Sequence, residues 1–586
     1  MFKRVFVPLL FLLFAWFIVS NNDAKVIIAG IAIFLIGMHY MENGFKLLSG
    51  GALEDILEKF TNTTPKAIGA GFMVTAVVQS SSLVSVIIIS FLSAELIGLT
   101  QAVGVVFGSN IGTTATAWLV SSFGLKIKIA QYALPMLIFG VIMQFSRENV
   151  YKGIGSVLIG LGFIFLGIAY MKDGFETLKE GLDLAEYAMQ GYPGVFVYIL
   201  FGAVATVVIQ SSSATMAIII TALATGQIDY INALSLAIGA NVGTTVTAAL
   251  GAMASNKNGK RLAVAHFIFN IITGIIAVIF IYQLKTLVDM LAPIFSISEN
   301  NYAMKLALFH SIFNIIGVLA VAPFTKQLVR YLESIFIIKE EGRGQPKYLT
   351  DEVMQIPASA LAAIRKETIH LYDKSLEAIV HAMNLHRSAI FSDIDIDKVI
   401  KRSRSPIKID INQIYQDDLK NLYSAIIHYS SLSQSYMSQE DNNKIYELKL
   451  TARKIIEMVK DVRELQKNLN LFSKSHNSFI LDEYNKLRIQ LIKVLRVIQE
   501  VRDYEGEEDI MTRIEVQKEK LKENEKALNE NIDTMIRDNQ INSKMASSLI
   551  NDVGFTFSIC KKLLSSATIL WVKQDEIKEL GDEYEY

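Results

Sequence analysis

The chain has 586 residues, of which 52% are hydrophobic and only 19% are charged, and its mean hydropathy is +0.36. A soluble protein of this length rarely has such a composition, so membrane-spanning helices are expected. The net charge of −1 gives no reason to expect a nucleic-acid partner, and the single cysteine, Cys560, excludes an internal disulfide and a cysteine-rich metal site.

The composition changes sharply near residue 335. Before it the chain consists of apolar blocks with sparse charge, whereas from Gln345 onwards it is charge-rich with apolar residues at helical spacing. We therefore expect an all-α protein with a transmembrane domain at residues 1–335, a linker at 336–346 and a soluble helical bundle at 347–586.

The transmembrane part opens with an apolar run at residues 5–20. A cleaved signal peptide is one interpretation of this short run, but no small-residue cleavage site follows it, so we expect a retained span. The next span covers residues 26–48. Near its end, Glu42 and Lys46 are spaced i,i+4, which predicts a local ion pair.

A polar Gln-Ser-Ser-Ser segment then interrupts the apolar stretch 67–97. Non-helical backbone at membrane depth is tolerated where protein or a water-filled cavity surrounds it, so the stretch is typical of a re-entrant helical hairpin. Spans at 101–121 and 127–146 follow. The first of them carries the motif Gly-x-Asn-x-Gly-Thr-Thr, beginning at Gly108.

The same order of features is then repeated. A second Gln-Ser-Ser-Ser hairpin at 198–224 precedes spans at 232–253 and 262–283, the first of which carries the second Gly-x-Asn-x-Gly-Thr-Thr motif. Both motifs recur at an offset of 131 residues (79 to 210, 110 to 241). Near the start of the second copy the order of the charges is reversed. Lys172 stands where the first copy has Glu42, and Glu176 stands where it has Lys46. A last span is expected at 305–331.

If each hairpin enters and leaves on one side, each copy crosses the membrane three times and the second is inverted relative to the first. Most positive charges then fall on the cytoplasmic side, as the positive-inside tendency requires, although Lys126 and Lys128 do not. The charge pattern predicts two inverted repeats, 25–147 and 153–283, with both chain ends in the cytoplasm. Such repeats with interrupted helices are typical of secondary transporters.

The polar residues indicate what a site built from them binds. Hydroxyl, amide and carbonyl oxygens suit Na+, and the N-termini of half-helices attract anions. No lysine or arginine lies within either hairpin, so a bound anion needs cations to offset its charge. The candidate residues are Gln79, Ser80, Ser81, Ser82, Gln210, Ser211, Ser212 and Ser213, with Asn110, Thr113, Thr114, Asn241, Thr244 and Thr245.

Two other interpretations are less favoured. Serines and threonines also serve simply to pack membrane helices, but two matched copies with matched downstream motifs argue for a site. A serine nucleophile lacks a histidine or carboxylate close in sequence, so we do not expect an enzyme. His266 and His310 occupy equivalent places on apolar helices and are expected to pack there rather than to bind a ligand.

These motifs resemble those of the type II sodium–phosphate cotransporter family over about residues 25–335. The resemblance implies sodium-coupled transport of inorganic phosphate in a lipid bilayer, with the eight hairpin residues lining the substrate site. Asn110, Thr113, Thr114, Asn241, Thr244 and Thr245 would complete that site and the sodium sites. The sodium stoichiometry, the direction of transport and the oligomeric state, a dimer included, stay open.

The helical tail resembles the PhoU-like domains that follow the transporter in bacterial members of the family. This implies a bacterial inner-membrane protein with a cytoplasmic tail, for which regulation of transport is the hypothesis that the resemblance offers. PhoU-type proteins bind metal through acidic clusters, but the one dense acidic group here, at residues 503–509, also fits a loop. Two alternatives are a cation-coupled carrier of another small anion, and a membrane phosphate sensor that signals through the tail.

Overall fold

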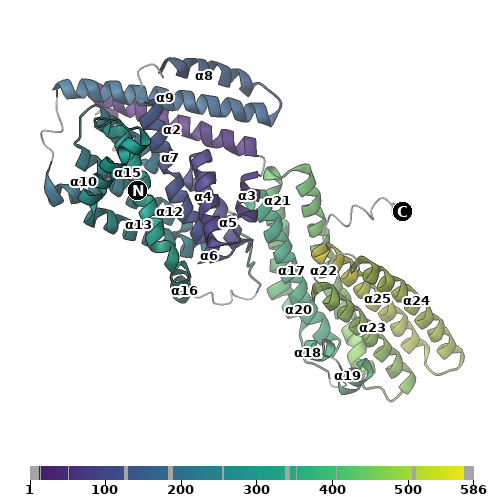
Figure 1. Cartoon of the computed structure of the whole chain (residues 1–586). Helices are drawn as coiled ribbons and strands as arrows, with labels where there is room; N and C mark the ends of the chain where they lie inside the picture. The colour runs from purple at the N-terminus through teal and green to yellow at the C-terminus, as the bar shows by residue number, and fades with distance from the viewer. Residues whose placement is uncertain are drawn as a thin grey trace. The chain divides into compact units, whose positions relative to one another are not determined.

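The computed structural model describes two compact units, Met1–Ile338 and Lys339–Tyr586. The residues described are 12, 15–16, 18–49, 52–124, 130–181, 189–253, 257–336, 344–351, 353–392, 394–403, 406–503 and 510–572. Within these ranges the regular structure is entirely helical, as the all-α expectation requires (Figure 1). Most of the first expected span, residues 5–20, lies outside the described residues.

The first unit consists of fifteen described α-helices of very unequal length. They are α2 (Asn22–Ser49), α3 (Ala52–Lys59), α4 (Thr64–Val78), α5 (Ser81–Ser93), α6 (Leu99–Gly112), α7 (Thr114–Leu119), α8 (Ala130–Gln144), α9 (Asn149–Gly181), α10 (Gly191–Ile209), α11 (Ser212–Ala224), α12 (Tyr230–Met253), α13 (Lys257–Ile279), α14 (Ile281–Leu291), α15 (Tyr302–Val321) and α16 (Thr325–Ile335).

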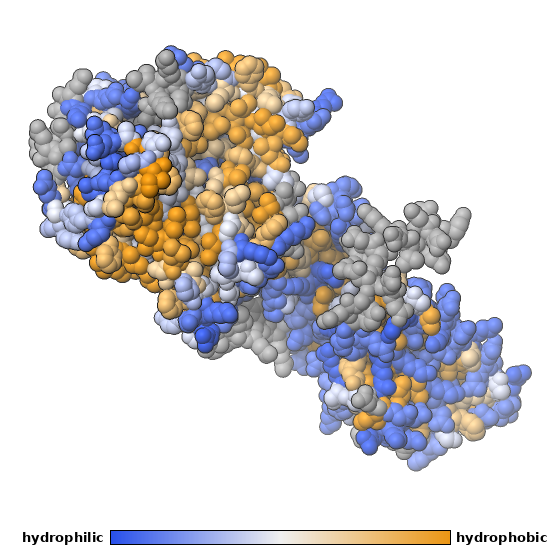
Figure 2. Space-filling model, in the orientation of Figure 1, coloured by the Kyte–Doolittle hydropathy of each residue, from blue (hydrophilic) through white to orange (hydrophobic). Residues whose placement is uncertain are grey.

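Among the described residues of this unit, six helical segments are long and apolar enough to cross a membrane. They are Asn22–Ser49, Leu99–Phe123, Asn149–Lys179, Gly191–Ile209, Lys257–Ile279 and Tyr302–Ile335. Apolar side chains gather on the surface of this unit, as Figure 2 shows. Phe139 on α8 and Val208 on α10, for example, are 62% and 76% exposed. An apolar surface of this kind is suited to lipid, and the chain is a multi-pass membrane protein.

Both expected hairpins are interrupted within their Gln-Ser-Ser-Ser segments. Gln79 ends α4 with φ = 60°, and Gln210 ends α10 with φ = 58°. Both backbones therefore adopt the left-handed conformation that terminates a helix. The arms are unequal, because α4 has 15 residues whereas α10 begins at Gly191 and has 19. The second arm is thus longer than the sequence indicated.

Three expected spans are also divided. The span 101–121 is broken at Thr113, between α6 and α7. The last one, 305–331, is broken into α15 and α16 by a short 3-10 helix, Ala322–Phe324. Pro323 explains this break, since proline has no N–H for the helical hydrogen bond. The span 262–283 is broken at Phe280, between α13 and α14.

Glycines of the repeated motif allow two pairs of helices to touch backbone to backbone. A Cβ added to Gly108 of α6 would lie 1.9 Å from the carbonyl oxygen of Ile68 in α4. A Cβ on Gly239 of α12 would lie 2.0 Å from that of Ile199 in α10. The offset of 131 residues relates both partners (108 to 239, 68 to 199). The repeat seen in the sequence is therefore also a repeat of tertiary contacts.

The helices that open the two repeats, α2 and α9, pack against each other. Glycines meet at three levels, where Gly30 faces Gly167, Gly37 faces Gly160 and the third pair is Gly44 with Gly153. The residue number rises along α2 as it falls along α9, so the helices are antiparallel. The residue 130 positions after Gly30 is Gly160, the partner of Gly37, and the residue 130 positions after Gly37 is Gly167, the partner of Gly30. This exchange is the relation expected between inverted copies.

The second unit is a helical bundle. Its longest helices are α17 (Pro357–Ala382), α22 (Gln439–Phe472), α23 (Ser478–Asp503), α24 (Ile510–Arg537) and α25 (Ser543–Trp571). By length and composition α25 is also a candidate span. It packs within the bundle, however, where Lys561 and Lys562 bind Glu525 and Asp461 at 2.7 Å and 2.8 Å.

Candidate functional site

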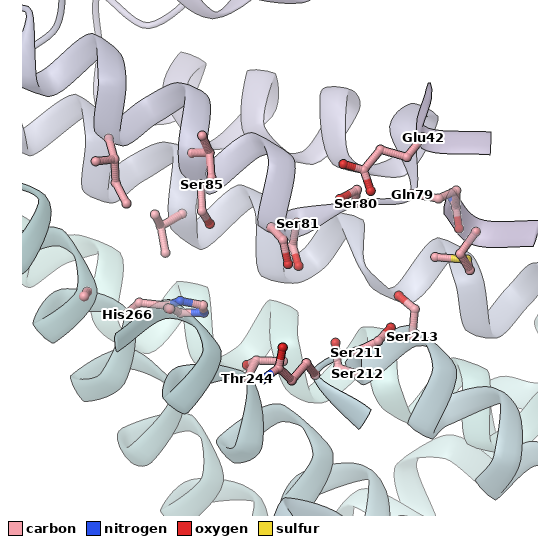
Figure 3. Close-up of a pocket in the computed structure, with 18 of the residues that line it drawn as sticks. Glu42, Gln79, Ser80, Ser81, Ser85, Ser211, Ser212, Ser213, Thr244 and His266 are labelled. Carbon is pink, nitrogen blue, oxygen red and sulfur yellow. The ribbon is translucent and has the colours of Figure 1, made fainter. Parts of the chain in front are cut away.

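Both Gln-Ser-Ser-Ser segments line one pocket of about 450 Å3 in the first unit. Figure 3 shows Ser80 and Ser81 on one side and Ser211, Ser212 and Ser213 on the other (Figure 3). All eight hairpin residues selected from the sequence belong to this lining. Segments more than 100 residues apart are therefore brought together in a single cavity.

The first serine of each segment caps the helix that follows. Ser80 Oγ accepts a hydrogen bond from the Leu83 N–H at 3.2 Å, and Ser211 Oγ accepts one from the Ala214 N–H at 3.2 Å. The N–H groups of the first two residues of each helix, Ser81 and Ser82 in α5 and Ser212 and Ser213 in α11, have no partner within the helix. The N-termini of α5 and α11 thus direct positive partial charge and free donors towards the pocket, which is the arrangement that binds anions.

Thr116, on α7, connects the two hairpins. Its Oγ1 lies 2.7 Å from Gln79 Oε1 and 3.2 Å from Ser213 Oγ. A threonine hydroxyl has one proton, so Thr116 donates to the amide oxygen and accepts from the serine. Gln79 also donates its Nε2 to Ala76 O. Gln79 is consequently buried and held in place, whereas Gln210 is exposed.

The Asn residues of the downstream motifs lie behind the pocket and do not line it. Asn110 Oδ1 is 3.4 Å from His266 Nε2, and Asn241 Oδ1 is 3.1 Å from His310 Nε2. Asn241 also donates to Asn314 Oδ1 at 2.8 Å. The two histidines thus join the motif asparagines, and His266 lines the pocket as well.

The Thr residues of the same motifs mostly bond back to their own helices. Thr113, Thr114 and Thr245 donate to carbonyl oxygens three residues earlier, at 2.7 to 2.8 Å. Thr244 does so too, at 2.5 Å, and it alone of the six downstream candidates also lines the pocket. The other five, Asn110, Thr113, Thr114, Asn241 and Thr245, surround the cavity without reaching its surface.

Glu42 of α2 lines the pocket, and the sequence indicated a different environment for it. Lys172 and Glu176 of the second copy do form the expected pair, at 3.6 Å. The expected pair between Glu42 and Lys46, both described, is absent, so that prediction was wrong. The sequence carries a signal for the actual arrangement, because Leu35, Met38, His39 and Glu42 share one helical face.

The pocket contains no lysine or arginine among its described lining residues. Its polar groups are hydroxyls, two amides, the imidazoles of His39 and His266, and one carboxylate. No group of three or more histidine, cysteine or acidic side chains suited to a metal ion occurs in the ranges that the structure describes. Most of the acidic group at 503–509 lies outside them.

The family model for Na+/Pi-cotransporters matches residues 33–173 and 189–337, which include both hairpins. The chain is 25% identical over 493 residues to YjbB of Escherichia coli O157:H7, named as a candidate inorganic phosphate exporter. That match covers 81% of this chain and 84% of the relative. YqeW of Bacillus subtilis is 28% identical over 263 residues, which are 45% of this chain and 84% of that protein.

A shorter match links the chain to sodium-dependent phosphate transport protein 2A of Mus musculus, at 31% identity over 98 residues, 16% of this chain and 15% of that protein. No solved structure matches. The family consists of transporters, which confirms that the chain is not an enzyme. Through residues 33–337, the chain belongs to the Na+/Pi-cotransporter family.

Proposed function

We propose that the protein is a symporter that carries inorganic phosphate across the membrane together with sodium ions. The observation that carries this proposal is the single pocket of about 450 Å3 that both Gln-Ser-Ser-Ser segments line. Family membership supports phosphate transport in general. Sodium coupling and the assignment of individual residues are our inferences from the chemistry of the pocket.

Phosphate binding is assigned to the tips of the two hairpins. The ends of α5 and α11 supply N–H groups, and Ser81, Ser82, Ser212 and Ser213 add hydroxyls. These donors solvate an anion without supplying a full positive charge. A divalent or monovalent phosphate in such a pocket is therefore favoured only when cations bind with it. This requirement supports coupling to a cation.

Sodium is the cation that the available ligands suit best, because hydroxyl, amide and backbone carbonyl oxygens are hard donors. We assign the sodium sites to the region between the hairpin tips and the two downstream motifs. Asn110, Thr113, Thr114, Asn241, Thr244 and Thr245 would supply oxygens there or hold the hairpins in position. Thr244, which lines the pocket, is the candidate for direct contact.

Alternating access requires two halves that move relative to each other around a fixed site. The proposed halves are the inverted repeats, related by offsets of 130 and 131 residues in their glycine contacts. We further propose that the protein lies in the bacterial inner membrane, and that the helical bundle is a cytoplasmic, PhoU-like domain that regulates transport.

Uptake of radiolabelled phosphate into proteoliposomes tests this function. We expect accumulation with an inward Na+ gradient and none with an equal K+ gradient. Because relatives are named as phosphate exporters, vesicles loaded with phosphate and sodium should be tested for efflux as well. Equal transport in Na+ and K+, or no phosphate movement in either direction by correctly inserted protein, would contradict sodium symport.

Removal of residues 345–586 separates a transporter from a membrane sensor. The bundle and the membrane unit are separate compact bodies, so the pocket residues lie entirely within the part that remains. We expect the truncated protein to keep sodium-driven uptake, with an altered rate if the bundle is regulatory. Loss of all uptake by truncated protein that still inserts would show that transport depends on the bundle.

A further inference from the structure

We propose that Glu42 selects phosphate over oxyanions that have no hydroxyl group, by accepting a hydrogen bond from a phosphate O–H. This inference rests on the proposed function, because it assumes that the pocket between the hairpins binds phosphate. It adds a specificity-determining residue, on α2, to a substrate site otherwise assigned to the hairpin tips.

The side chain of Glu42 reaches the pocket from α2. Leu35, Met38, His39 and Glu42 form one face of α2 and line the pocket together. Figure 3 shows the Glu42 carboxyl group extending from its helix on the side of the pocket where Ser80 lies. Close glycine contacts with α9 hold α2 in place, for example at Gly37.

This carboxylate is available to a ligand. Within the described part of the chain, Glu42 has neither an ion pair nor a hydrogen bond from another side chain. The neighbouring His39 is engaged instead with Asn43, at 2.9 Å between Nε2 and Nδ2. Glu42 therefore presents oxygen acceptors to the pocket that no described protein donor occupies.

Among the described lining residues, the carboxylate comes from the first repeat alone. The position related to Glu42 by the offset of 130 is Lys172, which pairs with Glu176 outside the pocket lining. No other described residue of the lining is acidic. A single acceptor suits a ligand with a single hydroxyl, whereas a second carboxylate would add further repulsion of the anion.

The chemistry then distinguishes between anions. Inorganic phosphate keeps at least one hydroxyl at physiological pH, while sulfate and monofluorophosphate are tetrahedral dianions without one. An O–H donor and a carboxylate form a short, charge-assisted hydrogen bond. An oxygen or fluorine atom in the same place would face the carboxylate without a proton between them, which is unfavourable for both groups.

The remaining polar groups of the pocket are neutral and make this distinction less strongly, because each of them can also donate. Serine hydroxyls and helix N–H groups can donate to any tetrahedral oxyanion. A site built to bind a ligand hydroxyl rejects analogues that lack it by up to roughly 10⁴-fold. A lone carboxylate in a pocket otherwise rich in donors is thus the group that best distinguishes an anion with an O–H group from one without.

The experiment measures inhibition of sodium-driven radiolabelled phosphate uptake by sulfate and by monofluorophosphate, in proteoliposomes of the full-length protein. With wild-type protein, we expect both to compete at least about 100-fold more weakly than unlabelled phosphate. In Glu42→Gln, the amide can donate to either competitor, so we expect this difference to shrink by about 10-fold or more and the KM for phosphate to rise.

Two further variants control the test. Glu42→Asp keeps an acceptor, so we expect weaker phosphate binding with the competitors still excluded. Glu176→Gln removes a carboxylate at a similar place on α9 that does not line the pocket, and should leave the competition ratios unchanged. The wild-type comparison with monofluorophosphate needs no substitution, so the proposal stays testable if Glu42→Gln fails to insert.

Three results would overturn the proposal. The first is equally strong competition by monofluorophosphate and phosphate in the wild type, and the second is unchanged competition ratios in Glu42→Gln. A change in Glu42→Gln confined to the half-saturating Na+ concentration would also overturn it, since Glu42 would then serve the cation. Absence of phosphate transport by the wild type would instead count against the proposed function itself.

Discussion

Replacement of either Gln79 or Gln210 by alanine is expected to reduce sodium-driven phosphate uptake to background, roughly 100-fold, while the protein still inserts into the membrane. The two residues act differently. Gln79 accepts a hydrogen bond from Thr116, so its loss disconnects the first hairpin from the second. Gln210 is exposed and lines the pocket, so its loss removes an amide available to the ligand. Hydrogen bonds to a charged group contribute about 1.5–3 kcal/mol each.

Uptake should be measured in proteoliposomes after normalisation to inserted protein. Gln131→Ala is a suitable control, because Gln131 lies exposed on α8 and does not line the pocket. We expect this control to transport like the wild type. Unchanged uptake in either Gln79→Ala or Gln210→Ala would refute the assignment of the hairpin tips as the substrate site.

Replacement of Gly108 or Gly239 by alanine is expected to destabilise the membrane unit strongly. The added Cβ would lie 1.9 Å from Ile68 O in the first case and 2.0 Å from Ile199 O in the second, so the paired helices must separate. Backbone atoms cannot move aside as a flexible side chain can. Overpacking in a protein interior costs about 1–3 kcal/mol and occasionally more, so a fall in Tm of roughly 5 °C or more is expected in detergent.

Gly69→Ala is the matched control, because Gly69 belongs to α4 and a Cβ there would meet no atom within 4 Å. Alanine is favoured over glycine in a helix by about 1 kcal/mol, so this variant should be as stable as the wild type or more so. Thermal unfolding followed by tryptophan fluorescence would compare the three variants. Wild-type Tm values for Gly108→Ala and Gly239→Ala would show that the helices are not packed this closely.

The sequence by itself determined which segments are repeated and where their helices break. An amide and three hydroxyls inside an apolar stretch are costly in lipid without partners, so their occurrence at a constant offset was sufficient to predict a shared polar site. The helix breaks at Gln79 and Gln210 follow the same pattern. The glycines of the repeated motif also recur as contacts at that offset.

Only the tertiary structure decided which polar residues reach the cavity. Asn241 stands three residues before Thr244 on α12, yet it bonds His310 and Asn314 of α15 instead of lining the cavity. Its counterpart Asn110 is likewise paired with His266 and does not line the cavity. Glu42 had a basic residue four positions away and was predicted to pair with it. The orientation of α2 against α9 turns Glu42 towards the pocket instead. A local spacing shows which pairs can form, whereas the packing of distant helices determines which side chains face the cavity.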